Sequence, residues 1–302
     1  MKNRSVVSHA GLKRYLMGVS WFILSLLISN ANDVVAKHLG SNLHPLQITF
    51  MRFFFGSLVL IPFMIHYGKA SFATTRLGLH ALRGLLLLGG IALWCHGLTL
   101  VPITVVTVLN FTIPLFTLVL AIFFLHERIG WSRWIATIGG FIGVLIVLEP
   151  QNASFQPQAL LLLLAAGMFA MLDVINKKYV VKETMLSMLF YVALATMLLG
   201  AIPALFVWES MIPQQVILLF FLGCGANLIL YCLLKAFACA DVSALAPFRY
   251  VELVFSALSG YFLFAEIPTR YTMLGAAVII PCTLFVVCYD ARRADRAASD
   301  SK

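Results

Sequence analysis

Charged residues are scarce in this sequence. Only 11% of its 302 residues are Asp, Glu, Lys or Arg, against about 25% in a typical soluble domain. Hydrophobic residues make up 62%. A soluble fold of this size has too little interior to bury that much apolar surface. The composition therefore excludes an ordinary soluble protein and predicts a chain that is embedded in lipid.

Motifs for nucleotides and metals are also lacking. No P-loop is present, which argues against direct drive by ATP, and no HExxH sequence occurs. Gly223-Cys224-Gly225 begins like a dinucleotide fingerprint, but its third glycine is replaced by Leu228. The six cysteines form no CxxC pair and are expected to be small core residues. We therefore expect no metal, no cofactor and no catalytic residues, and interpret the chain as a protein other than an enzyme.

Long apolar runs dominate what is present. A membrane-spanning helix needs roughly 20 mostly apolar residues, whereas strands of a membrane barrel alternate over about ten. The apolar runs here are continuous and long enough for helices. The sequence therefore predicts an all-α polytopic membrane protein with ten transmembrane helices: 15–38, 46–66, 79–100, 103–125, 132–149, 158–178, 185–208, 214–236, 241–264 and 271–289.

The net charge of +9 is distributed unevenly among the connections. Basic residues gather in 2–14, 69–76, 128–133, 177–182 and 292–302, whereas the connections at 100–103, 150–157 and 209–213 have none. Cytoplasmic connections of membrane proteins carry the excess of Lys and Arg. We expect both termini to be cytoplasmic, and the basic excess to meet anionic membrane lipid rather than nucleic acid.

The chain repeats itself at a spacing of about 140 residues. Residues 33–37 (DVVAK) are echoed by 173–177 (DVINK), and 125–127 (LHE) by 264–266 (FAE). The echoes predict two halves, 1–150 and 151–302, with five helices each. Because five is odd, the second half must enter the membrane in the opposite orientation, which is a recurrent plan of secondary transporters. The alternative is chance similarity between apolar sequences.

Two prolines and one glycine pair predict local features of the helices. Pro114 and Pro247 should interrupt the fourth and ninth helices, because proline removes a backbone donor. Such breaks are tolerated in lipid where they face protein or a water-filled cavity. The pair Gly139 and Gly143 predicts a close contact between helices.

Arg249 and Glu252 carry the strongest local signal for a binding site. They follow Pro247, lie three residues apart and so share one helix face, where they can pair. A charge at the centre of a bilayer costs at least about 2.5 kcal/mol. We expect both side chains to face a cavity, with Arg249 taking a carboxylate by a two-point contact and Glu252 taking a cation. The alternative is an ion pair that only locks the ninth helix.

Other polar residues near helix ends are weaker candidates. Asp33 and Asp173 each precede a lysine by four residues, an order that also suits a self-neutralised helix end. Arg52 could pair with Asp33 or bind lipid phosphates, and Arg83 is interpreted as a cytoplasmic anchor. The remaining candidates, which are amides near these acids and aromatic residues that could stack or hold a cation, are Asn30, Asn176, Trp94, Tyr191, Phe248 and Tyr250. For each aromatic residue the alternative is plain packing.

Two inverted sets of five helices resemble the EamA-type branch of the drug/metabolite transporter superfamily. Pro45, Arg52, the stretch 114–127 and Glu266 carry this resemblance. Longer stretches, 29–34, 52–55, 169–178 and 246–253, are similar to the S-adenosylmethionine uptake transporters of rickettsia-type bacteria. This closer resemblance covers nearly the whole chain.

The resemblance implies that the chain imports S-adenosylmethionine across a bacterial inner membrane, in exchange for S-adenosylhomocysteine. The charged candidates suit that ligand, which has an amino-acid end, a sulfonium and an adenine. Three alternatives remain open. The first is a proton-coupled exporter of amino acids or other amphipathic metabolites. The others are a membrane-embedded transferase, which the absence of a catalytic cluster disfavours, and an assembly subunit, which would not require charges in the ninth helix.

Overall fold

The computed structural model describes residues 9–40, 43–68, 72, 74, 76–100, 109–148, 159–264 and 270–299, and these residues contain helices and no strand. The helices are α1 (His9–Gly40), α2 (Pro45–His66), α4 (Leu77–Leu100), α6 (Ile113–Leu120), η1 (Ala121–Leu125), α7 (Trp131–Leu148), α8 (Ala159–Tyr179), α9 (Met185–Leu205), α10 (Pro213–Cys239), α11 (Val242–Leu245), η2 (Ala246–Tyr250), α12 (Val251–Phe264) and α13 (Arg270–Ser299). Helices occupy all ten expected ranges. Residues 103–108, the connection 150–157 and Glu266 of the second echo lie outside the described residues.

Six of the described helices are long and apolar enough to cross a membrane. These candidate spans are Lys13–Ala36, Pro45–His66, Leu77–Trp94, Leu160–Tyr179, Met185–Leu205 and Pro213–Cys239. Shorter apolar helices occupy Ile113–Leu125, Trp131–Ile146 and Met273–Cys282. The number of membrane spans therefore stays a prediction, whereas the all-helical character is confirmed.

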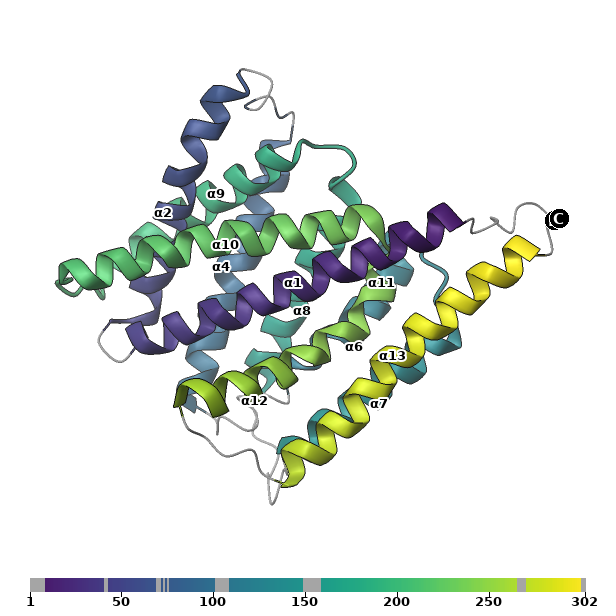
Figure 1. Cartoon of the computed structure of the whole chain (residues 1–302). Helices are drawn as coiled ribbons and strands as arrows, with labels where there is room; N and C mark the ends of the chain where they lie inside the picture. The colour runs from purple at the N-terminus through teal and green to yellow at the C-terminus, as the bar shows by residue number, and fades with distance from the viewer. Residues whose placement is uncertain are drawn as a thin grey trace.

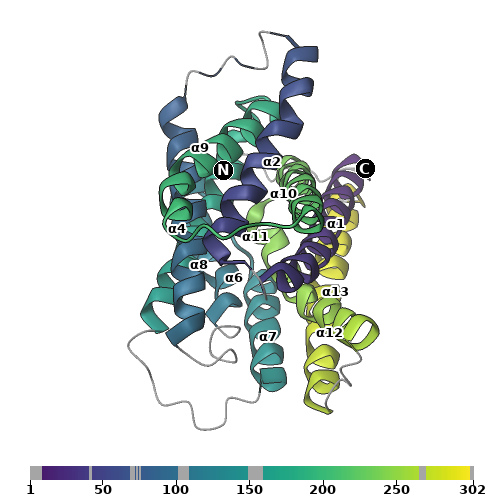
Figure 2. The ribbon, with the colours of Figure 1, turned by 90° about the vertical axis from the view of Figure 1, so that its left-hand side faces the viewer.

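The helices pack in pairs that are far apart in sequence. α1 lies along α10, α13 lies along α7, and α2 contacts both α9 and α10 (Figure 1). α4 contacts α8 and α9, α6 contacts α8, and α12 contacts α1. Figure 2 shows α4, α8 and α9 on one side of the bundle and α1, α12 and α13 on the other.

The two prolines mark different local structures. Pro247 lies in η2, a short 3-10 segment that separates α11 from α12, so the expected interruption is present. Pro114 lies in the first turn of α6, directly after helical residues 109–110 and a turn at 111–112, so the fourth helix is interrupted here as expected. This position suits proline, since the first backbone N–H groups of a helix have no partner within it.

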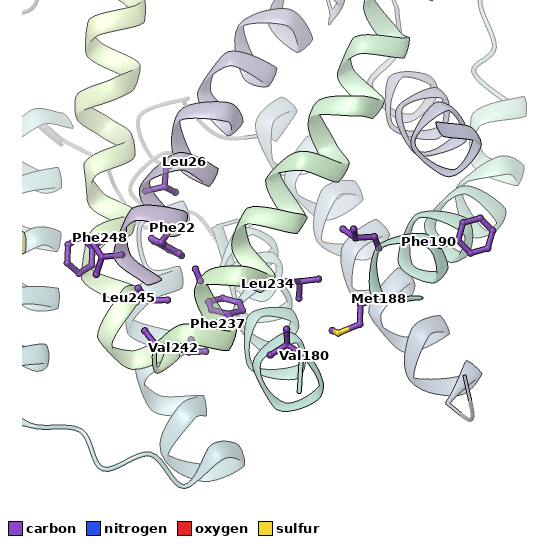
Figure 3. Packing of buried hydrophobic residues seen from close by; sticks show 14 of the residues in the cluster. Phe22, Leu26, Val180, Met188, Phe190, Leu234, Phe237, Val242, Leu245 and Phe248 are labelled. Carbon is purple, nitrogen blue, oxygen red and sulfur yellow. The ribbon is translucent and has the colours of Figure 1, made fainter. Parts of the chain in front are cut away.

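Close contacts between helices form at small residues. A Cβ on Gly139 would meet Cys282, and one on Gly143 would meet Ile279 of α13, which confirms the expected contact. Larger side chains fill a cluster between α1, α9, α10 and η2 that includes Phe22, Phe237 and Phe248 (Figure 3). Lipid is as apolar as these side chains, so van der Waals fit and small residues must hold the helices together.

A polar network joins helix ends on the side where α1 begins. The Glu127 carboxylate accepts hydrogen bonds from the backbone N–H groups of Val242 and Ser243, at 3.2 and 3.1 Å, and from the Ser243 hydroxyl. Arg133 donates to the Ser243 hydroxyl at 2.7 Å and pairs with Asp241 at 3.5 Å. These contacts connect η1 and α7 to the start of α11, whose backbone donors would otherwise lack partners.

Candidate functional site

A cavity of about 460 Å³ lies between α1, α4, α8, α10 and the segment η2–α12. Its volume falls in the range of about 300–1,000 Å³ that is typical of small-molecule sites. The charged residues on its wall are Asp33, Asp173, Arg249 and Glu252. The other polar and aromatic residues on the wall are Ser25, Ser29, Asn110, Phe22, Trp94 and Phe169. A small polar molecule with an apolar or aromatic part would fit this mixture.

Arg249 makes an ion pair with a neighbouring helix. Its Nη2 lies 2.5 Å from Oδ2 of Asp173 in α8, and the two side chains are 20% and 9% exposed. The sequence suggested Glu252 as the partner of Arg249 and Lys177 as the partner of Asp173. Lys177 instead donates to the carbonyl oxygens of Phe237 and Ala240, at 2.7 and 2.6 Å. Arg249 is thus held at the cavity wall by a residue far away in sequence.

Two further carboxylates give the cavity an acidic character. Asp33 is exposed to the cavity, and Glu252 is half-buried on the same wall as Ser29. Asp33 and Glu252 repel each other, and Arg52, which does not line the cavity, attracts Asp33. Three carboxylates therefore face one guanidinium on the wall. This balance favours a ligand with positive charge, because opposite charges attract strongly away from bulk water.

Two aromatic candidates next to Arg249 pack away from the cavity wall. Tyr250 is fully buried against Phe111 and Ile279. Phe248 is buried in the cluster of Figure 3. Their neighbour Arg249 points to another face because adjacent residues in a helix are not on the same side.

Three other candidates do not line the cavity, and two of them make hydrogen bonds elsewhere in the protein. Tyr191 donates its hydroxyl proton to the carbonyl of Phe72 at 2.8 Å and stacks on His80. Asn176 is buried and accepts a hydrogen bond from Arg83. Asn30 is half-buried and is absent from the wall. Of the eleven sequence candidates, the cavity brings together Arg249, Glu252, Asp33, Asp173 and Trp94.

Arg83 differs most from its interpretation as an anchor at the membrane surface. Its side chain is fully buried. It donates to the Asn176 side chain at 2.9 Å and to the Met188 carbonyl at 3.0 Å, and lies 3.1 Å from the His80 ring. Arg83 therefore joins α4 to α8 and α9 inside the bundle.

Several wall residues were missed from the sequence because they carry no charge. Ser29, Asn110 and Phe169 line the cavity, but isolated serine, asparagine and phenylalanine residues are common in helices that only pack. A usable signal is their spacing from the charged residues: Ser29 comes one turn before Asp33, and Phe169 one turn before Asp173.

Comparison with known proteins identifies the family of this bundle. Residues 16–149 and 156–288 each match the EamA-like transporter family. The chain belongs to the EamA-like transporter family. This membership confirms the resemblance inferred from the sequence, a multi-pass membrane fold, and transport in preference to enzymatic activity.

Two relatives of known name and one solved structure extend the comparison within the EamA-like family. The S-adenosylmethionine uptake transporter of Rickettsia prowazekii is 51% identical over 276 residues, which cover 91% of this chain and 94% of that protein. A riboflavin transporter of Vibrio cholerae is 30% identical, with 93% and 96% covered. A crystal structure with 18% identity superposes with a TM-score of 0.78 over 93% of this chain and 98% of that one, which shows the shared fold.

Proposed function

We propose that this EamA-like protein imports S-adenosylmethionine across a bacterial inner membrane. The observation that carries the proposal is the 51% identity, over most of both chains, to an S-adenosylmethionine uptake transporter. The riboflavin transporter, at 30% identity, is the more distant relative of the two. A cavity with both a guanidinium and an excess of carboxylates is consistent with a zwitterionic ligand that carries an additional positive charge.

The charged residues on the wall bind the charged groups of the ligand through residues of opposite charge. Arg249 binds the carboxylate, because its planar guanidinium can donate two parallel hydrogen bonds. Asp173 keeps the guanidinium at the wall through the 2.5 Å ion pair. Glu252 and Asp33, whose mutual repulsion is relieved by a cation between them, bind the ammonium and the sulfonium.

The protein exchanges S-adenosylmethionine for S-adenosylhomocysteine. Loss of the methyl group removes the sulfonium charge and leaves the carboxylate, the ammonium and the adenine unchanged. One cavity can therefore accept both compounds with contacts that differ at a single charge. The acidic wall, with Asp33 and Glu252, supports tighter binding of the imported, more cationic partner.

The chain consists of two inverted five-helix repeats, 1–150 and 151–302, with ten spans. Two matches to one family model, at residues 16–149 and 156–288, support this division. The contacts support it too. In this division the helices of the first half, α1, α2, α4, α6 and α7, correspond in order to α8, α9, α10, α12 and α13 of the second. Exchanging the halves turns the contact between α1 and α10 into one between α8 and α4, and the structure contains both contacts. The pairs α2–α9 and α7–α13 then map onto themselves.

Alternating access would use the two ends of the bundle differently. The wall residues of α4, Ile91 and Trp94, belong to its second half. The polar network of Glu127, Arg133 and Asp241 lies at the end where α1 begins. The distribution of basic connections supports a cytoplasmic position for that end and for both chain termini. In this arrangement the network closes the cytoplasmic side while the cavity faces outward.

Uptake by right-side-out membrane vesicles tests this function. Labelled S-adenosylmethionine, riboflavin, methionine and adenosine are offered separately, with and without an uncoupler. The proposal predicts uptake of S-adenosylmethionine alone. The uncoupler should slow this uptake, because the exchange carries one positive charge inward, but should not abolish it, because no proton is transported. Complete loss of transport on uncoupling would instead favour coupling to protons, and uptake of riboflavin alone would contradict the assigned substrate.

A further inference from the structure

Asn110 lies at the cavity wall near two aromatic rings. It is half-buried, and within the part of the chain that the structure describes its side-chain amide has no hydrogen-bond partner. Leu162 packs against both Trp94 and Leu109, the residue before Asn110. The Phe169 ring lies against Gly90, one turn before Trp94 on α4. An amide with free hydrogen-bonding capacity is therefore held near two flat apolar surfaces.

Resting on the proposed substrate, we propose that Asn110 determines specificity for adenine, with Trp94 and Phe169 as the stacking surfaces. An asparagine amide matches one edge of adenine: its oxygen accepts from the N6 amino group while its nitrogen donates to N7. Bases also stack favourably on aromatic side chains. Asn110 would thus recognise the base at the opposite end of the ligand from Arg249.

The repeat strengthens this assignment, because the wall is built from matching positions of the two halves. Asn110 precedes Arg249 by 139 residues, and Ile113 precedes Glu252 by the same number. The two family matches end at residues 149 and 288, which gives the same spacing. Asn110 is therefore the counterpart of Arg249 and lies on the same cavity from the other half.

The two halves differ chemically at these matched positions. The second half presents Arg249 and Glu252, which are charged, whereas the first half presents Asn110 and Ile113, which are neutral. Trp94 is likewise matched 139 residues later by Leu233, so the large flat ring is on the neutral side. A ligand with a charged end and a neutral aromatic end fits this asymmetry, with Arg249 and Glu252 facing one end and Asn110 and Trp94 facing the other.

Binding of base analogues to the purified, full-length protein tests the inference. The ligands are S-adenosylhomocysteine, its 7-deaza analogue, which lacks the N7 acceptor, and its inosine analogue, which carries oxygen in place of the N6 amino group. Thermal-shift titration reports the three affinities without requiring transport. The wild type should bind each analogue about tenfold more weakly than the adenine compound.

Two substitutions at Asn110 separate the two contacts. Asn110→Ala should bind all three ligands within about twofold of one another, because no hydrogen bond to the edge of the base remains and stacking does not distinguish them. Asn110→Asp keeps an acceptor for N6 and loses the donor for N7, so it should still reject the inosine analogue but no longer the 7-deaza one. Arg249→Lys is the matched control: it should weaken all three ligands and leave their ratios as in the wild type.

The outcomes distinguish this inference from the proposed function. Two results would refute adenine recognition by Asn110 while leaving the proposed substrate intact. One is equal binding of the three ligands by the wild type, and the other is wild-type affinity ratios in both Asn110 variants. If the wild type binds neither S-adenosylhomocysteine nor S-adenosylmethionine, the proposed substrate is wrong and the adenine site fails with it.

Discussion

Arg249 and Asp173 form an ion pair across two helices, with 2.5 Å between Nη2 and Oδ2, on the wall of the central cavity. The pair connects the 3-10 segment η2 to α8. It leaves Glu252 and Asp33 as the carboxylates without a guanidinium partner on the wall. The charge balance of the cavity follows from this pairing, and so do the expected effects of substitution.

Removing one partner of this pair should destabilise the protein more than removing both. Asp173→Asn leaves the mostly buried Arg249 charge without its counter-ion, at an expected cost of about 3 kcal/mol. The double variant Asp173→Asn, Arg249→Gln should recover part of that loss. Thermal unfolding in detergent measures both, and a double variant less stable than Asp173→Asn would contradict a paired role.

The shape of Arg249 should matter as well as its charge. Arg249→Lys should lower the affinity for S-adenosylmethionine about tenfold, because an ammonium cannot reproduce the planar two-point contact with a carboxylate. Concentration-dependent uptake, normalised to the amount of protein in the membrane, gives the change. Unaltered uptake would show that the carboxylate binds elsewhere.

Glu252 should distinguish the two exchange partners by their charge. Glu252→Gln should weaken S-adenosylmethionine more than S-adenosylhomocysteine, because only the former carries a sulfonium. Competition of unlabelled S-adenosylhomocysteine against labelled S-adenosylmethionine measures the ratio of the two affinities. Equal loss for both compounds would assign Glu252 to the shared ammonium, and loss that follows protein abundance would assign it to helix packing.

Arg83 should contribute to stability through its buried contacts. Arg83→Ala removes the hydrogen bonds to Asn176 and Met188 and should lower stability by at least about 3 kcal/mol. Arg76→Ala is the control, because Arg76 is 41% exposed and its 3.7 Å pair with Glu183 should contribute less than about 1 kcal/mol. Similar unfolding temperatures for the two variants would contradict a structural role for Arg83.

The sequence located the helices well and the site in part. Lipid requires long apolar runs, so the helix ranges agree with the structure to within a few residues at many ends, although α1 and α13 extend beyond their predicted spans. Charges inside such runs are costly, which made Arg249 and Glu252 visible, and the repeated stretches 33–37 and 173–177 drew attention to Asp33 and Asp173. Their partners were not visible, because Arg249 meets Asp173 only through helix packing. Asn110 is neutral and gave no signal in the sequence. It became a candidate only because the structure places it on the cavity wall.

Accumulation of labelled S-adenosylmethionine by proteoliposomes that contain only this protein tests the central claim most directly. The vesicles are preloaded with unlabelled S-adenosylhomocysteine, and empty vesicles and protein-free liposomes serve as controls. We predict transient accumulation above the external concentration in preloaded vesicles and little uptake in empty ones. Equal labelling of preloaded proteoliposomes and protein-free liposomes would contradict the assignment of this chain as an S-adenosylmethionine transporter.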